Sequence, residues 1–78
     1  TKRYSYHQMN DYYCVVDKKG KFIFKYIINT STKKEEVFNI INDFKENNNL
    51  ISSLNPMYLD SLRREIKSHF NIDNFNEQ

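Results

Sequence analysis

The fold is decided by two neighbouring stretches of sequence, Tyr12-Tyr13-Cys14-Val15-Val16 and Phe22-Ile23-Phe24-Lys25-Tyr26-Ile27-Ile28. Asp17-Lys18-Lys19-Gly20 lies between them, and Gly20 suits the left-handed position of a turn, so they predict a β-hairpin. Successive side chains of a strand point to opposite faces, and only Lys25 interrupts the apolar residues on the two faces of the second arm. Antiparallel hairpins that pack on one side alternate apolar with polar residues. This hairpin therefore predicts a sheet that needs a cover on both faces.

A capped amphipathic helix is predicted directly after the hairpin. Thr32-Lys33-Lys34-Glu35 matches a capping box, in which the threonine hydroxyl and the glutamate satisfy backbone N–H groups at the start of a helix. Apolar residues then recur at helical spacing: Val37, Phe38, Ile40, Ile41 and Phe44. A second helix is predicted from Asn55-Pro56, with asparagine as N-cap and proline at the first helical position. Its apolar stripe consists of Leu59, Leu62, Ile66 and Phe70.

The remaining elements complete an α+β domain. Lys2-Arg3-Tyr4-Ser5-Tyr6 alternates as a short strand, and the segment from His7 to Asp11 is expected to be a polar connection. The predicted order is β-β-β-α-α, a three-stranded antiparallel sheet followed by two helices, in a single small domain over residues 1–78 with a frayed tail at 71–78. We expect both helices on one sheet face. The other face would then be an aggregation hazard or a binding site.

Composition favours binding over catalysis. The 78 residues carry a net charge of +2 with both signs interspersed, so no long-range field attracts nucleic acid or anionic lipid. The lone Cys14 excludes an internal disulfide and a multi-cysteine zinc site, and its mid-strand position indicates a buried structural thiol. Neither His7 nor His69 has a companion at metal-ligand spacing, and we interpret Glu65 and His69 as a solvated pair. With one glycine, no phosphate-binding glycine loop is possible. We expect no enzymatic activity, no cofactor and no metal.

Single-stranded nucleic-acid binding is an alternative, because aromatic residues on a sheet with lysines between them can stack bases. However, the RNP-type consensus is absent and the predicted strand order differs, so aromatic residues of a core or protein interface are the better interpretation. Arg63 and Arg64 on the last predicted helix diverge by about 100° around its axis. We therefore expect a solvated helix face rather than a recognition helix.

The predicted order of elements resembles the second half of a longin domain, the profilin-like N-terminal module of longin-type vesicle SNAREs. Tyr4-Ser5-Tyr6 is similar to the tyrosine-containing third strand of the family, and the two hairpin arms are similar to its fourth and fifth strands. Residues 36–44 are similar to the start of its second helix, and Tyr58 to Phe70 to its last helix. The first two strands and first helix of the family have no counterpart here, and neither does its heptad-patterned SNARE motif.

The resemblance implies a non-enzymatic regulatory module of vesicle trafficking that binds a SNARE motif or a sorting or coat protein to control membrane fusion. It implies a cytosolic protein at the cytoplasmic face of secretory or endosomal membranes. The implied partner-binding residues, on the strand side of the family's groove, are Lys2, Tyr4, Ser5 and Tyr6. Two further partners are expected for the uncovered sheet face: a missing N-terminal segment that covers the sheet, or a second copy of the chain. A small phage or bacterial inhibitor or immunity protein is the main alternative from another class.

Overall fold

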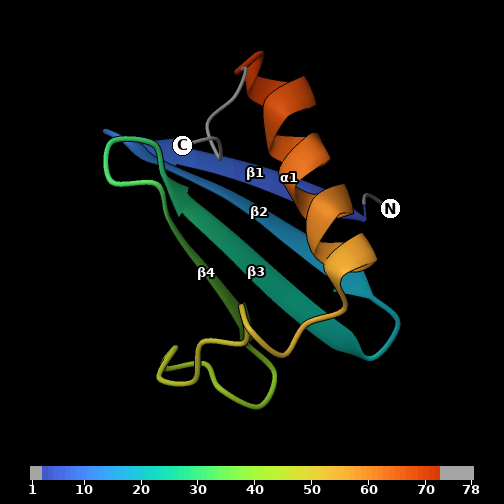
Figure 1. Cartoon of the computed structure of the whole chain (residues 1–78). Helices are drawn as coiled ribbons and strands as arrows, with labels where there is room; N and C mark the ends of the chain where they lie inside the picture. The colour runs from blue at the N-terminus through green and yellow to red at the C-terminus, as the bar shows by residue number, and fades with distance from the viewer. Residues whose placement is uncertain (1–2, 73–78) are drawn as a thin grey trace.

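The computed structural model describes residues 3–72 as a four-stranded antiparallel sheet with one helix (Figure 1). The elements are β1 (Tyr4–Met9), β2 (Tyr12–Lys19), β3 (Phe22–Asn29), β4 (Lys34–Asn39) and α1 (Pro56–Phe70). The strands lie in the sheet in chain order, and each runs antiparallel to its neighbours. The class is α+β, but the order is β-β-β-β-α. The predicted three strands and two helices are therefore wrong.

The predicted central hairpin is present, with longer arms. β2 and β3 pair along their whole lengths, residues 12–19 against residues 22–29. Gly20 has a φ of +64°, the left-handed conformation expected for it, which glycine adopts without a steric penalty. The prediction that residues 17–19 belong to the turn is wrong, because they continue the ladder between the two strands.

The helix predicted after the hairpin is also wrong, because Lys34–Asn39 forms β4 and pairs with β3. Val37 is fully buried and Phe38 is 4% exposed, although the two side chains point to opposite faces of the sheet. Without β4, the outer backbone groups of β3 would form an unpaired edge between two apolar faces. Pairing with β3 therefore overrides the helical spacing of the residues from Val37 to Phe44, as tertiary context commonly overrides local preference.

The residues that match a helix cap form the turn between β3 and β4 instead. The Asn29 side chain accepts hydrogen bonds from the backbone N–H groups of residues 31 and 32, at 2.9 and 3.1 Å. Thr32 Oγ1 accepts from the N–H of Lys34, but Lys33 between them has a φ of +67°, which is not a helical conformation. Asparagine and threonine side chains satisfy backbone donors in turns as well as at helix starts. The motif therefore did not specify a helix.

The second predicted helix is confirmed as α1. The Asn55 side chain accepts from the N–H groups of Met57 and Tyr58, and Pro56 lies at the start of the helix. The helix ends at Asn71, which is left-handed with a φ of 57°. Residues 73–78 of the predicted tail lie outside the described residues.

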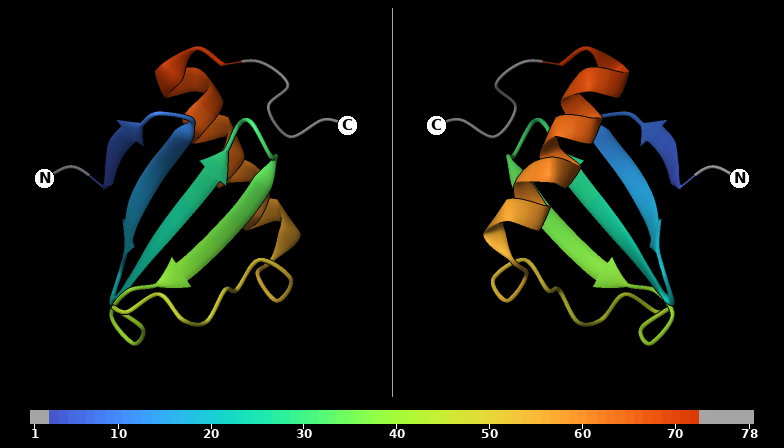
Figure 2. Two further views of the ribbon diagram at one scale, coloured as in Figure 1. Left: turned by 90° about the vertical axis from the view of Figure 1, so that its left-hand side faces the viewer. Right: turned by 90° about the vertical axis from the view of Figure 1, so that its right-hand side faces the viewer.

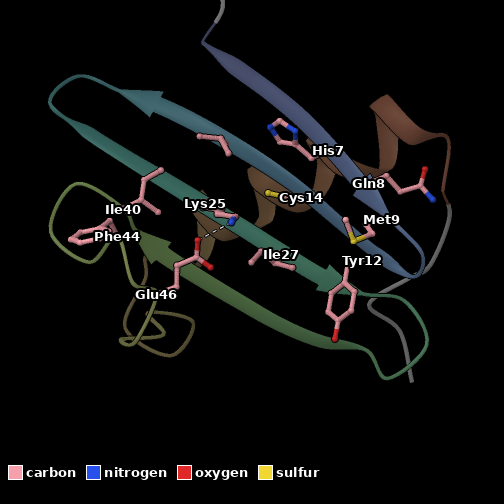
Figure 3. Close-up of a pocket in the computed structure, with 11 residues that line it drawn as sticks. His7, Gln8, Met9, Tyr12, Cys14, Lys25, Ile27, Ile40, Phe44 and Glu46 are labelled. Atoms are coloured by element: carbon pink, nitrogen blue, oxygen red, sulfur yellow. Dashed lines mark hydrogen bonds and ion pairs between the residues drawn. The ribbon is translucent and has the colours of Figure 1, made fainter.

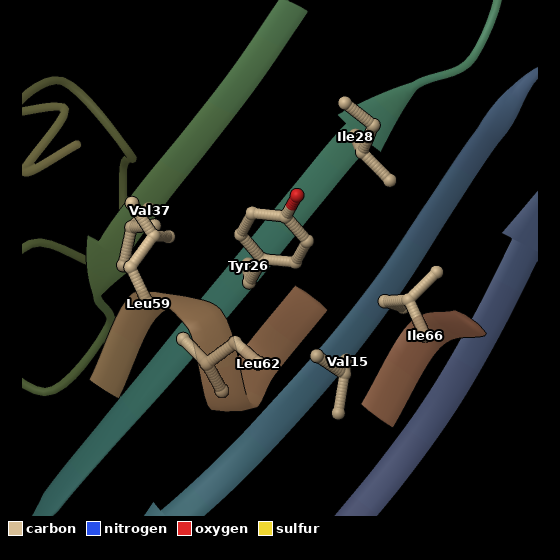
Figure 4. Packing of buried hydrophobic residues seen from close by; sticks show 7 residues of the cluster. All are labelled: Val15, Tyr26, Ile28, Val37, Leu59, Leu62 and Ile66. Atoms are coloured by element: carbon tan, nitrogen blue, oxygen red, sulfur yellow. The ribbon is translucent and has the colours of Figure 1, made fainter. Parts of the chain in front are cut away.

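The core between sheet and helix (Figure 4) consists of Val15, Tyr26, Ile28, Val37, Leu59, Leu62 and Ile66.

The first strand is longer than predicted. Residues 7–9 belong to β1 and pair with β2, so the polar connection expected from His7 to Asp11 is reduced to the turn Asn10-Asp11. Asn10 has a φ of 54°, and asparagine tolerates this left-handed conformation better than most residues.

α1 covers one face of the sheet only: in Figure 2 it lies behind the sheet in the left view and in front of it in the right view.

Candidate functional site

A groove with a volume of about 730 Å³ lies on the sheet face opposite α1 (Figure 3). Val15 and Ile28 contribute to the core beneath α1. Their strand neighbours Cys14, Val16 and Ile27 point to the other face and line the groove. This is the second apolar face that the two-sided hairpin predicted, and no helix covers it among the residues that the structure describes.

Large apolar side chains are exposed around this groove. Met9 of β1 is 73% exposed, Tyr12 of β2 is 51% exposed and Phe44 of the 40–55 connection is 76% exposed, and all three line the groove. Val16 and Ile27 are half-buried on its floor. Met9 and Tyr12 lie at one end of the groove and Phe44 at the other (Figure 3), and exposed apolar side chains along one groove mark a binding surface or an aggregation hazard. Phe44 is therefore at the rim of the groove and not in a helix stripe, as its spacing had predicted.

The lysine that interrupts the apolar face is paired. Lys25 Nζ lies 2.7 Å from Glu46 Oε2, and both side chains are 30% exposed. Glu46 belongs to the 40–55 connection and has a φ of +59°, a conformation that costs a non-glycine residue about 1 kcal/mol or more. The ion pair attaches this connection to the sheet and neutralises Lys25. An apolar partner thus meets a paired charge in this part of the groove.

Cys14 lies in the groove but is only 8% exposed. Burial raises the pKa of its thiol to about 11, so the thiol is protonated at neutral pH. A protonated thiol is a poor nucleophile and a poor metal ligand. The prediction of a buried thiol is confirmed.

On the other face of the sheet, a buried carboxylate joins the sheet to α1. Asp17 of β2 is fully buried and accepts hydrogen bonds from Arg3 Nε at 2.7 Å and Nη2 at 3.2 Å. It also accepts a short hydrogen bond from the Tyr58 hydroxyl of α1. Burial and this carboxylate both raise the pKa of Tyr58. The cluster could not be predicted, because the sequence pattern places Asp17 in the hairpin turn.

A second polar cluster holds β4 against α1. Arg63 makes two hydrogen bonds to the Glu35 carboxylate, Nε to Oε2 at 2.6 Å and Nη2 to Oε1 at 2.8 Å, and the Tyr26 hydroxyl donates to the same carboxylate at 2.6 Å. Burial alone would raise the pKa of Glu35, but the hydrogen bonds from Arg63 and Tyr26 outweigh it, and the pKa is lowered. The predicted solvated role of Arg63 is therefore wrong, since its guanidinium is held between helix and sheet.

Three of the predicted partner-binding residues, Tyr4, Ser5 and Tyr6, lie on β1 at an edge of the sheet. Tyr6 faces α1: its hydroxyl donates to Glu65 Oε1 at 2.5 Å, and its ring stacks on His69 with 3.7 Å between ring centroids. Burial and Glu65 raise the pKa of Tyr6 to about 12. Tyr4 shares that face, Ser5 points to the opposite one, and Lys2 lies outside the described residues. Their role in binding stays a prediction, and Glu65 and His69 are not simply a solvated pair.

Within residues 3–72, His, Cys, Asp and Glu side chains form no group of three or more that could hold a metal ion. In that same part of the chain, no helix has the length and apolar character needed to cross a membrane. No family model, curated protein or solved structure matches this chain.

Proposed function

We propose that this chain is a non-enzymatic protein-interaction module that binds an amphipathic helix of a partner protein in the groove opposite α1. The gathering of Met9, Tyr12 and Phe44, all largely exposed, around one mainly apolar groove carries this proposal. Burying a Met or Phe side chain contributes about 1.5–3 kcal/mol. A few such side chains at the centre of an interface supply most of its binding energy.

The width of the groove fits one helix. The 40–55 connection lines the groove through Ile40, Phe44 and Glu46, which leaves β1, β2 and β3 as its open floor. Two inter-strand spacings make this floor about 10 Å wide. An α-helix with its side chains is about 10–12 Å across.

The covered face of the sheet shows the chemistry that such a helix needs. α1 packs on these strands through an apolar stripe of Leu59, Leu62 and Ile66. A partner helix with a stripe of the same spacing would give the sheet its second cover, in the helix-in-groove mode of recognition. The two polar flanks of the partner helix would lie near His7 of β1 and near the Lys25–Glu46 pair at β3.

The test compares exposed apolar residues inside and outside the groove. Phe44→Asp and Met9→Asp change groove residues that are more than two-thirds exposed, so the fold should tolerate both. Met57→Asp is the matched control, because Met57 is 80% exposed and lies in the first turn of α1, where an acidic residue is tolerated. A protein retained by the immobilised wild-type chain is identified, purified and titrated against all four forms by isothermal calorimetry.

We expect Phe44→Asp and Met9→Asp each to raise the Kd at least about tenfold, because the lost burial exceeds 1.4 kcal/mol. Met57→Asp should leave the Kd unchanged, and far-ultraviolet circular dichroism should show that the bound partner segment is helical. Equal Kd values for Phe44→Asp and Met57→Asp, or a partner segment that binds in an extended conformation, would overturn the proposal.

The proposal requires no family assignment. The vesicle-trafficking role implied by the longin resemblance stays a prediction, and residues 36–44, which supported its second helix, begin within strand β4. The inhibitor or immunity protein and the nucleic-acid-binding module also stay predictions. Support for either role would require that its specific partner be shown to bind, whereas the helix-binding proposal is supported by the groove itself.

A further inference from the structure

Within residues 3–72, the two edges of the sheet differ in whether another segment covers them. At β4, the Val37 N–H donates to Asn49 Oδ1 at 2.9 Å, and the Val37 carbonyl accepts from the Leu50 N–H at 2.7 Å. Asn49 Nδ2 also donates to the Glu35 carbonyl at 3.5 Å. The N–H and carbonyl of Val37 and the carbonyl of Glu35 are therefore occupied by the chain's own 40–55 connection.

The β1 edge, in contrast, points backbone groups outward. The Lys18 N–H donates to the Arg3 carbonyl, which fixes the phase of the antiparallel ladder between β1 and β2. Bonded and non-bonded pairs alternate in such a ladder. The N–H and carbonyl groups that turn away from β2 are consequently those of Tyr4, Tyr6 and Gln8.

The sequence of β1 does not protect this edge. Natural sheets protect edge strands with charged side chains, prolines, bulges or a covering segment. β1 is YSYHQM, without Lys, Arg, Asp, Glu or Pro, and it pairs with β2 in unbroken register from Tyr4 to Met9. A strand with these properties is a template for pairing with another strand.

We propose that β1 pairs antiparallel with β1 of a second copy of this chain, about a two-fold axis at Tyr6. In this register Tyr6 lies opposite the partner's Tyr6, Tyr4 opposite the partner's Gln8, and Ser5 opposite the partner's His7. The outward N–H and carbonyl groups of the two strands then bond to each other. Each cross-strand pair is compatible, because none places like charges opposite each other.

The geometry closes this assembly at two copies. A two-fold interface uses the β1 edge of both subunits. At the β4 edges the Val37 N–H, the Val37 carbonyl and the Glu35 carbonyl are occupied, so pairing does not continue into a fibre. α1 lies closest to β2, and the two β2 strands would be three inter-strand spacings, about 14 Å, apart. Helices about 10–12 Å across can lie side by side at that distance.

Dimerisation would also join the two grooves, because His7 and Met9 of β1 line each groove beside the two-fold axis. The interface rests on one strand and is small, so the dimer should be weak, with a Kd that is micromolar or higher. The inference concerns the β1 edge rather than the groove face, and it goes beyond the proposed function without depending on it.

Sedimentation equilibrium from micromolar to millimolar protein tests the pairing. The Gln8 N–H points outward, so Gln8→Pro removes no bond to β2 but blocks the edge, whereas the control Gln8→Ala keeps the N–H. Wild type and Gln8→Ala should dimerise reversibly. Gln8→Pro should raise the dimer Kd at least about tenfold, because two intermolecular donors are lost per dimer.

A charge exchange tests the register of the two β1 strands. It also tests the pairing itself if Gln8→Pro does not fold. Ser5→Lys with His7→Lys places lysines opposite lysines at both 5–7 contacts, and should weaken the dimer at least about tenfold. Ser5→Lys with His7→Glu places opposite charges there and should restore the dimer.

A wild-type chain that is monomeric at millimolar concentration, a dimer that survives Gln8→Pro, or equal Kd values for the two double variants would overturn the inference. None of these results would change the comparison of Phe44→Asp with Met57→Asp.

Discussion

Replacing Tyr58 with phenylalanine should destabilise the fold by about 1.5–3 kcal/mol, the contribution of a hydrogen bond to a charged group. The Tyr58 hydroxyl donates to Asp17, whose side chain is fully buried. Phenylalanine keeps the ring, which packs edge-on against Phe24 with 5.5 Å between centroids, so the change removes only the hydroxyl. The buried carboxylate would then be left with its bonds from Arg3.

Urea unfolding followed by circular dichroism measures this loss. Small domains have total stabilities of about 5–15 kcal/mol, so the change is a large fraction of the total. At roughly 4–8 °C per kcal/mol, the Tm should fall by about 6–24 °C. Tyr12→Phe is the matched control, because Tyr12 is 51% exposed on the opposite face and its hydroxyl should contribute little.

A double-mutant cycle with Asp17→Asn separates this hydrogen bond from other effects of the substitution. In the Asp17→Asn background the Tyr58→Phe change should cost less, because the charged acceptor is already gone. Equal losses of unfolding free energy for Tyr58→Phe and Tyr12→Phe, or additive effects of the changes at Asp17 and Tyr58, would refute a stabilising role of this hydrogen bond.

Three further predictions concern Glu35, Cys14 and Asn55. The pKa of Glu35 is lowered in the fold, so its carboxylate stabilises the fold above pH 4.5, and this stabilisation is lost as the pH falls through the folded-state pKa. In Glu35→Gln, the free energy of unfolding should therefore fall less steeply with decreasing pH than in the wild type, as measured by urea unfolding. Cys14, with a pKa of about 11, should react with a thiol reagent at neutral pH about 100-fold more slowly than a free cysteine, and unfolding in urea should abolish the difference. Asn55→Ala should lower the unfolding free energy by about 1 kcal/mol in urea titrations, because it removes the acceptor for two N–H groups of α1, whereas Asn55→Asp should preserve most of it.

The elements that could be predicted from sequence are those with complete local signals. The β2–β3 hairpin has alternating apolar arms and Gly20 at a left-handed position, and α1 begins at Asn55-Pro56. The second apolar face could also be predicted, because the period of a strand alone assigns Ile27 and Ile28 to opposite faces. These signals do not depend on residues far away in the chain.

The features that could not be predicted depend on distant residues. The segment from Val37 to Phe44 has helical spacing, and only the free edge of β3 decides that it begins as a strand. The Asp17–Tyr58 contact joins residues 41 positions apart, and the Tyr6–Glu65 contact joins residues 59 positions apart. Phe44 could be placed at the groove rim only once β4 was known to end before it.

The central claim is that the sheet face opposite α1 binds a partner protein. The most direct test is methyl nuclear magnetic resonance of Ile27 and Ile28, which are adjacent in β3 and point to opposite faces. On titration with the purified partner, we predict a large shift and intermolecular contacts for the Ile27 methyl groups and little change for Ile28. A shift of Ile28 as large as that of Ile27, or an unchanged Ile27 in a saturated complex, would contradict the claim.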